Sequence, residues 1–128
     1  MTRLLAALIV SLISTQVFAM NSLSELTWKK RVVIVFSDAG DARAARQIEA
    51  LTNQRSELEE RDLVVISVVD DKATTAFGRI AEPEAVALRD EADVKKGSFK
   101  VVLVGKDGGI KLRSETIVPE VELFDVID

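Results

Sequence analysis

Residues 31–37 read Arg-Val-Val-Ile-Val-Phe-Ser, and the apolar run between Arg31 and Ser37 predicts a β-strand buried on both faces. A second run of this kind, at residues 63–69, follows a segment long enough to form a helix. Two strands separated in this way pair in parallel through a right-handed crossover. The sequence therefore predicts a βαβ unit, and a ligand site is expected beyond the carboxyl ends of the strands, in the loop after Ser37.

The composition excludes several classes of chemistry. The chain has 128 residues, of which 48% are hydrophobic and 30% charged, as expected for one small globular domain. It contains no Cys and no His, which excludes thiol redox chemistry, imidazole bases and His/Cys zinc sites. The net charge of −4 gives no basis for nucleic-acid binding, which needs a basic surface, and no motif calls for a cofactor.

Residues 1–19 have the pattern of a secretory signal peptide. Arg3 supplies the positive charge, residues 4–13 are apolar except for Ser11, and small side chains at Val17 and Ala19 precede an expected cleavage after Ala19. An uncleaved membrane anchor is the alternative, but the apolar stretch is shorter than the roughly 20 residues that span a bilayer. We therefore expect a mature domain at residues 20–128, periplasmic or secreted, without stable membrane insertion.

The segments around the first strand have simple expected roles. Trp28, the only tryptophan, precedes this strand and is expected to pack over the edge of the sheet rather than to bind a partner. Asp41 is expected to cap a helix that extends to about Glu60. Glu57 and Arg61 are spaced to form an exposed ion pair. The side chains expected to face the sheet from this helix are Ala44, Ile48, Leu51 and Leu58.

The second half of the chain predicts a loop, a helix, a hairpin and a closing helix. Residues 72–82 are expected to form a loop, followed by a short helix that starts at Pro83. Strands at residues 101–104 and 110–113 flank the turn Lys-Asp-Gly-Gly at 106–109, in which Gly108 or Gly109 is expected to adopt a positive φ. Pro119 starts the last helix, with Val121, Phe124 and Ile127 towards the sheet. The order β-α-β-α-β-β-α predicts an α/β, thioredoxin-like three-layer sandwich with a mixed central sheet.

Short motifs along the chain are Trp28 with Arg31, Gln47, the sequence Arg-Asp-Leu at 61–63, and Leu-Val-Gly-Lys-Asp-Gly at 103–108 with Lys111. Their order and spacing resemble the DUF4174 family, a bacterial domain of unknown function, over nearly all of the mature chain. The resemblance implies a thioredoxin-like fold in secreted or periplasmic proteins and a relation to domains of animal extracellular sushi-repeat-containing proteins. It implies no established reaction. Relatives continue with a Met-Pro-Met-Arg-like stretch beyond Asp128, so any function in that stretch is expected to be absent.

A thioredoxin-like fold would place redox cysteines between Ser37 and Arg43. This chain reads Ser-Asp-Ala-Gly-Asp-Ala-Arg there, and it has Ser-Phe-Lys at 98–100, where thioredoxins carry a proline before the third strand. We therefore expect the scaffold without its thiol activity. The first hypothesis is a non-catalytic binding or accessory domain whose partner is an unknown envelope or extracellular protein. Its candidate binding residues are Ser37, Asp38, Asp41, Asp70, Asp71, Lys106 and Asp107.

Two other hypotheses use the charged residues. Asp38 and Asp41 follow the first strand and Asp70 and Asp71 the second, so the four carboxylates could form a divalent-metal site or an enzyme centre at the strand ends. Ordinary roles as a helix cap, turn formers and loop residues are favoured for them. The basic set Lys106, Lys111 and Arg113 suits an anionic polymer, although charges on an edge strand also prevent aggregation.

The signal-peptide interpretation predicts that the exported protein begins at Met20. Intact-mass measurement of the protein recovered from the host's envelope or medium checks this. A washed membrane fraction that retains the chain with residues 1–19 still attached would contradict both the cleavage site and the expected location.

Overall fold

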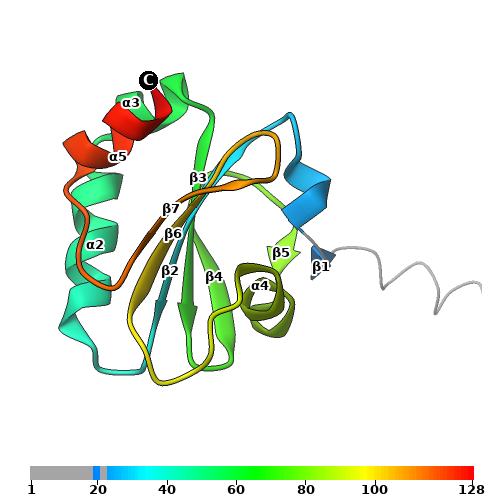
Figure 1. The fold of residues 1–128 in the computed structure, drawn as a ribbon, viewed down its shortest axis with the longest axis vertical. Coiled ribbons are helices and arrows are strands. Elements are labelled where there is room, and N and C mark those ends of the chain that lie inside the picture. Colours follow the sequence, from blue (N-terminus) through cyan, green and yellow to red (C-terminus); the bar gives the residue numbers. More distant parts are fainter. Residues whose placement is uncertain (1–18, 21–22) are drawn as a thin grey trace, which may run out of the picture.

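The computed structural model describes residues 19–20 and 23–128, so most of the predicted signal peptide lies outside the described residues. In the described part, one sheet lies between two helical layers, which confirms the predicted fold class (Figure 1). No helix in this part is long and apolar enough to span a membrane. Helices α2 (Ala42–Thr52), α3 (Arg55–Glu60) and α5 (Glu120–Ile127) cover one face of the sheet, and α4 (Ala85–Ala92) covers the other.

The sheet has five strands in the order β4-β3-β2-β6-β7. β2 (Arg31–Ser37) pairs in parallel with β3 (Leu63–Val69) over the full length of both strands, as predicted. On its other side β2 pairs antiparallel with β6 (Lys100–Val104), which continues into β7 (Ile110–Ser114) through the predicted hairpin. Every residue of β2 except the first is buried, because the strand has neighbours on both edges and helices over both faces.

The segment after β3 is a strand, not the loop expected from the sequence. β4 (Lys72–Phe77) pairs antiparallel with β3 at the edge of the sheet. Its side chains alternate between solvent and a partly buried face, so the segment lacks the continuous apolar run of the central strands. Pro83 does not start α4 either: it is buried in the two-residue strand β5 (Glu82–Pro83), which pairs with β1 (Ala19–Met20).

The helices also differ in detail from the prediction. The expected single helix from Asp41 to Glu60 is interrupted at Asn53 and Gln54, where Gln54 has the non-helical φ of −108° and ψ of 49°. In α5, Val121 is 64% exposed and does not face the sheet, because the buried side of this helix is formed by Leu123 and Phe124. A short 3-10 helix, η1 (Leu23–Leu26), precedes β2.

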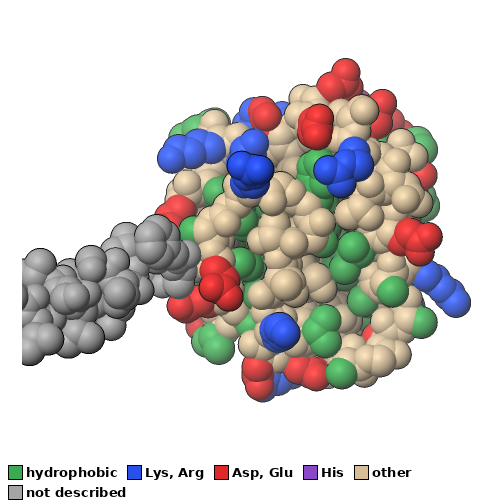
Figure 2. Space-filling view, turned by 180° about the vertical axis from the view of Figure 1, so that it is seen from behind, with side chains coloured by type: hydrophobic (Ala, Val, Ile, Leu, Met, Phe, Trp, Pro, Cys, Tyr) green, Lys and Arg blue, Asp and Glu red, His purple; other side chains and the backbone are tan. Residues whose placement is uncertain are grey.

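The surface carries charges of both signs, interspersed over the face shown in Figure 2 with small groups of hydrophobic side chains between them. Edge strand β4 contributes the exposed side chains of Lys72 and Thr74. Polar and charged side chains on an edge strand oppose pairing with another chain.

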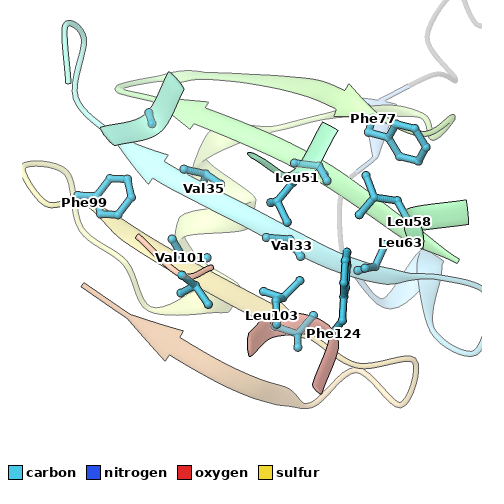
Figure 3. Packing of buried hydrophobic residues seen from close by; sticks show 14 residues of the cluster. Val33, Val35, Leu51, Leu58, Leu63, Phe77, Phe99, Val101, Leu103 and Phe124 are labelled. Carbon is cyan, nitrogen blue, oxygen red and sulfur yellow. The ribbon is translucent and has the colours of Figure 1, made fainter. Parts of the chain in front are cut away.

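The sheet separates two apolar cores. Alternate residues of β2 point to opposite faces: Ile34 and Phe36 pack towards α4, whereas Val33 and Val35 pack towards α2, α3 and α5. Figure 3 shows the second core, where Leu51 and Leu58 lie against the strands. Of the predicted helix stripe, Ala44, Leu51 and Leu58 are buried and Ile48 is partly buried.

One polar side chain is fully buried beside the second core. The Nε2 of Gln47 donates to the carbonyl oxygen of Val118 at 2.9 Å, and its Oε1 accepts from the backbone N–H of Val118 at 2.7 Å. The amide thus satisfies both backbone groups of a residue that belongs to no strand or helix. This pair of bonds fixes the segment between β7 and α5 against α2.

The hairpin turn has the expected geometry. Gly108 adopts a φ of 84°, a conformation that glycine enters without steric cost, and the N–H of Gly105 donates to the carbonyl oxygen of Gly109 at 2.8 Å. The prediction of a positive φ at Gly108 or Gly109 is therefore confirmed.

Replacing Gln47 with Leu is expected to destabilise the fold strongly. The substitution leaves the N–H and C=O of Val118 buried without partners, at about 1–3 kcal/mol for each group. We expect the free energy of unfolding to fall by about 2–4 kcal/mol and the melting temperature by about 10 °C or more. Gln54→Leu, the same exchange at a side chain without a capping hydrogen bond, is the control and is expected to change stability by about 0.5 kcal/mol or less. Equal losses from both variants in circular-dichroism melts would contradict the role given to Gln47.

Candidate binding site

The loop after β2 holds two of the predicted site residues and ties each to a different partner. Asp38 accepts a hydrogen bond from the backbone N–H of Gly97 at 3.1 Å, in the loop before β6. Asp41 caps α2, as predicted, by accepting from the N–H of Arg43 at 3.0 Å. Its carboxylate also binds the Arg43 guanidinium at 3.0 and 2.7 Å, which lowers the pKa of Asp41.

In the loop after β3, Asp70 and Asp71 also have different partners. Asp71 forms an ion pair with Lys96. Asp70 adopts a φ of 50°, and its carbonyl oxygen accepts from the guanidinium of Arg89 at 3.2 and 2.9 Å. Ser37 is fully buried, and its Oγ has no hydrogen-bond partner in the described part of the chain. Among residues 19–20 and 23–128, no group of three or more carboxylates is arranged to hold a metal ion.

Two contacts join the segment after β2 to the loop before β6. The first is the hydrogen bond from Gly97 to Asp38, and the second places the guanidinium of Arg43 over the ring of Phe99, 4.7 Å from its centroid. A guanidinium in this position is attracted by the negative face of the aromatic ring. Asp38 and Arg43 therefore both have partners in the loop before β6.

A different set of residues converges at the opposite end of the sheet. The start of β2, the end of β6, the hairpin turn and the end of α5 enclose a cavity of about 300 Å³ that we call the Trp28 pocket. Apart from Gln47, the motifs that resemble the DUF4174 family lie in this pocket or beside it. The pocket is lined by Trp28, Arg31, Leu103, Gly105, Lys106, Asp107, Lys111, Val126 and Ile127.

Trp28 does not pack over the sheet edge as expected, because its side chain is 73% exposed. Its backbone has a φ of 67°, in the left-handed region, and its N–H donates to the carbonyl oxygen of Lys106 at 2.6 Å. A positive φ is uncommon for a bulky residue and costs roughly 1–2 kcal/mol. The fold therefore holds the indole in solvent at an energetic cost, beside the half-exposed side chain of Val126.

Of the three cations that line the Trp28 pocket, two pair with carboxylates and one bonds to a backbone carbonyl. Lys106 binds Asp62 at 2.7 Å, and Lys111 binds Asp107 at 2.8 Å; these bonds lower the pKa of both carboxyl groups. Arg31 donates instead to the backbone carbonyl oxygen of Arg61 at 2.8 Å. Within the described residues, Arg31 has no carboxylate at ion-pair distance.

Arg61 supports the pocket from the side of α5. Its guanidinium binds both carboxylate oxygens of Asp128, at 3.0 and 2.7 Å, and the carboxylate of Glu57 at 2.7 Å, as predicted for the Glu57–Arg61 pair. The Asp128 bond is the main cause of the raised pKa of Arg61, and it lowers the pKa of Asp128. The guanidinium also lies 4.5 Å from the centroid of the Phe124 ring. These contacts hold the end of α5, which supplies Val126 and Ile127 to the pocket.

The structure thus divides the predicted site residues between the two ends of the sheet. Lys106 and Asp107 line the Trp28 pocket, whereas Ser37, Asp38, Asp41, Asp70 and Asp71 lie at the other end. The predicted basic set is also divided, because Arg113 donates to the backbone carbonyls of Ala92 and Asp93 at the end of α4. Arg31 and Val126 were not predicted as site residues. The sequence Trp-Lys-Lys-Arg at 28–31 was the available signal, since it flanks a lone aromatic residue with cations.

Comparisons with known proteins agree with this fold. The sequence matches the family described as "Domain of unknown function (DUF4174)" over residues 22–128, and the comparison with curated proteins gives no match. The mitochondrial 2-Cys peroxiredoxin from Plasmodium falciparum is a similar structure, with 12% identity, a TM-score of 0.58, and coverage of 83% of this chain and 78% of that chain. The thioredoxin domain of a thiol-disulfide oxidoreductase from Bacteroides vulgatus has 18% identity and a TM-score of 0.51, with coverage of 80% and 83%. These similarities show a thioredoxin-like fold alone.

Acid is expected to destabilise the end of the sheet that holds the Trp28 pocket. Bonds to Lys106 and Arg61 lower the pKa of Asp62 and of Asp128 in the folded chain. A carboxyl group with a lowered pKa stabilises the fold fully above its unfolded value of about 3.9, and this stabilisation is lost as the pH falls through the folded value. The melting temperature should therefore fall as the pH drops from about 4 towards 2.

The variant Asp62→Asn with Asp128→Asn should show a smaller fall in melting temperature over the same pH range. Asp90→Asn removes an exposed carboxylate that forms no ion pair within the described residues, and it is the control. If the double variant and the parent lose the same number of degrees on acidification, these two carboxylates do not contribute to the acid sensitivity.

Proposed function

The chain belongs to the DUF4174 family, and from this premise we propose that it is a secreted or periplasmic, non-catalytic binding or accessory domain without thiol redox activity. The Trp28 pocket is its binding surface, and an envelope or extracellular protein is its partner. The observation that carries this proposal is the indole of Trp28, 73% exposed on a backbone with a φ of 67°. Gly or Asn would hold such a turn at lower cost, so the backbone conformation does not favour Trp at this position. Strained backbone and exposed aromatic rings are both features of binding sites.

The carboxyl end of the sheet supports the absence of thiol catalysis. The chain contains no cysteine, and the segment from Ser37 to Arg43 carries a buried serine and a helix cap where a redox pair would be expected. The hydroxyl of Ser37 has no base beside it to activate it, since its Oγ has no hydrogen-bond partner in the described residues. A thioredoxin-like domain that lacks the redox cysteines can still bind a partner through its surface.

The location rests on the sequence pattern of residues 1–19. Export would place the domain in an oxidising compartment, where small proteins often use disulfides. This chain has none available, so its two apolar cores must supply its stability.

Capture from the host's envelope extract tests the binding function. The purified protein is immobilised in three forms: the parent, Trp28→Ala and Val86→Ala. Val86 is the matched control, because it is 67% exposed on α4 and does not line the Trp28 pocket. We expect the parent and Val86→Ala to retain the same partner, and Trp28→Ala to lose most of it, with equal melting temperatures for the three forms.

Equal retention by Trp28→Ala would contradict the assignment of the binding surface. Disulfide-reductase turnover by the purified parent would contradict the non-catalytic role.

A further inference from the structure

The Trp28 pocket has a charge opposite to that of the whole chain. Arg31, Lys106 and Lys111 line it with a single carboxylate, Asp107, although the chain carries a net charge of −4. A cavity with an excess of one sign of charge raises the local concentration of ligands with the opposite sign. The pocket therefore favours an anionic group.

Arg31 is the cation that is available to such a group. The charges of Lys106 and Lys111 are already matched, by Asp62 at 2.7 Å and by Asp107 at 2.8 Å. The guanidinium of Arg31 has five N–H donors, and its hydrogen bond in the described structure goes to a neutral carbonyl. The charge of Arg31 contributes to the lowered pKa of Asp62 and of Asp128, but neither carboxylate bonds to its guanidinium in the described structure. A planar guanidinium with donors left over suits the two oxygens of a ligand carboxylate.

The rest of the pocket is apolar and small. The exposed indole of Trp28 and the half-exposed Val126 provide two hydrophobic walls. The volume of about 300 Å³ is at the lower limit of small-ligand pockets, enough for one large side chain and not for a folded surface. Both the carboxylate and the apolar group must therefore come from one residue or from two adjacent residues.

A chain terminus meets this requirement within a single residue. We propose that the Trp28 pocket binds the carboxyl-terminal residue of a partner protein, with the free α-carboxylate on Arg31 and an apolar or aromatic side chain against Trp28 and Val126. This inference rests on the proposed binding function and names the part of the partner that is bound. Capture of a terminal carboxylate is an established mode of peptide recognition.

Four acetylated peptides test the proposal by NMR titration of the isotope-labelled protein. The first is acetyl-Gly-Ser-Gly-Phe with a free carboxylate, and the second is the same peptide with a terminal amide. The third, acetyl-Gly-Ser-Gly-Gly with a free carboxylate, lacks the side chain. The fourth, acetyl-Gly-Ser-Phe-Glu with a terminal amide, moves the carboxylate to a side chain. We expect the first to bind about tenfold more tightly than the other three, as a charge-assisted hydrogen bond implies.

Variants of the protein locate the contact. Arg31→Gln should reduce the affinity for the first peptide to that for its amide, and Arg31→Lys should give an intermediate value because it keeps the charge without the planar fork. Arg79→Gln removes an exposed positive charge that does not line this pocket and should change nothing. The ratio of the parent protein's affinities for the first and second peptides requires no variant, so the test holds even if Arg31→Gln fails to fold.

The outcomes separate this inference from the proposed function. If the acid and the amide bind equally, if the internal glutamate peptide binds as tightly as the acid, or if none of the four peptides binds, carboxyl-terminal recognition is overturned. The proposed binding function would then still be decided by the capture experiment with Trp28→Ala and Val86→Ala.

Discussion

The rest of the structure depends on the position of β2, which has a strand on each edge and helices over each face. The middle of such a strand has no contact with water, so the side chains there must be apolar in both directions. This constraint produces the run of Val, Ile and Phe and divides the interior into two cores. The two ends of β2 have different surroundings. The carboxyl end leads to α2, and the amino end adjoins the hairpin turn and the Trp28 pocket.

The prediction from sequence was accurate where burial is complete and failed where it is partial. The sequence predicts β2 and β3 because each holds at least four consecutive Val, Ile, Leu or Phe residues, and it predicts the turn at Gly108 because few residues tolerate a positive φ. The sequence predicts a loop at β4 because Phe77 is its only buried residue and the other five are exposed or partly buried, as on an edge strand. The break at Asn53 was missed because the apolar stripe continues through it to Leu58, which packs in the same core.

The site was harder to predict than the fold. The carboxylates at the strand ends were candidates because parallel strands usually present ligands there. In this chain, however, each of these carboxylates has a separate partner within the protein. Asp38 accepts from Gly97, Asp41 accepts from Arg43, and Asp71 pairs with Lys96. The prominence of Trp28 depends on its backbone angle and on its bond to Lys106, 78 residues further along the chain, and neither is visible in a local pattern. A lone tryptophan among lysines was the available hint, and general burial statistics favoured the opposite interpretation.

The way Trp28 is held has a consequence for local stability. Its turn is joined to the hairpin by a backbone hydrogen bond to Lys106, while its indole contributes little to either apolar core. Segments held by few buried contacts open with less free energy than the whole domain. The fluorescence of Trp28, the only tryptophan, therefore reports on the opening of this turn before the cores melt. A tryptophan-fluorescence melt and a circular-dichroism melt are expected to differ even where the domain itself unfolds in one step.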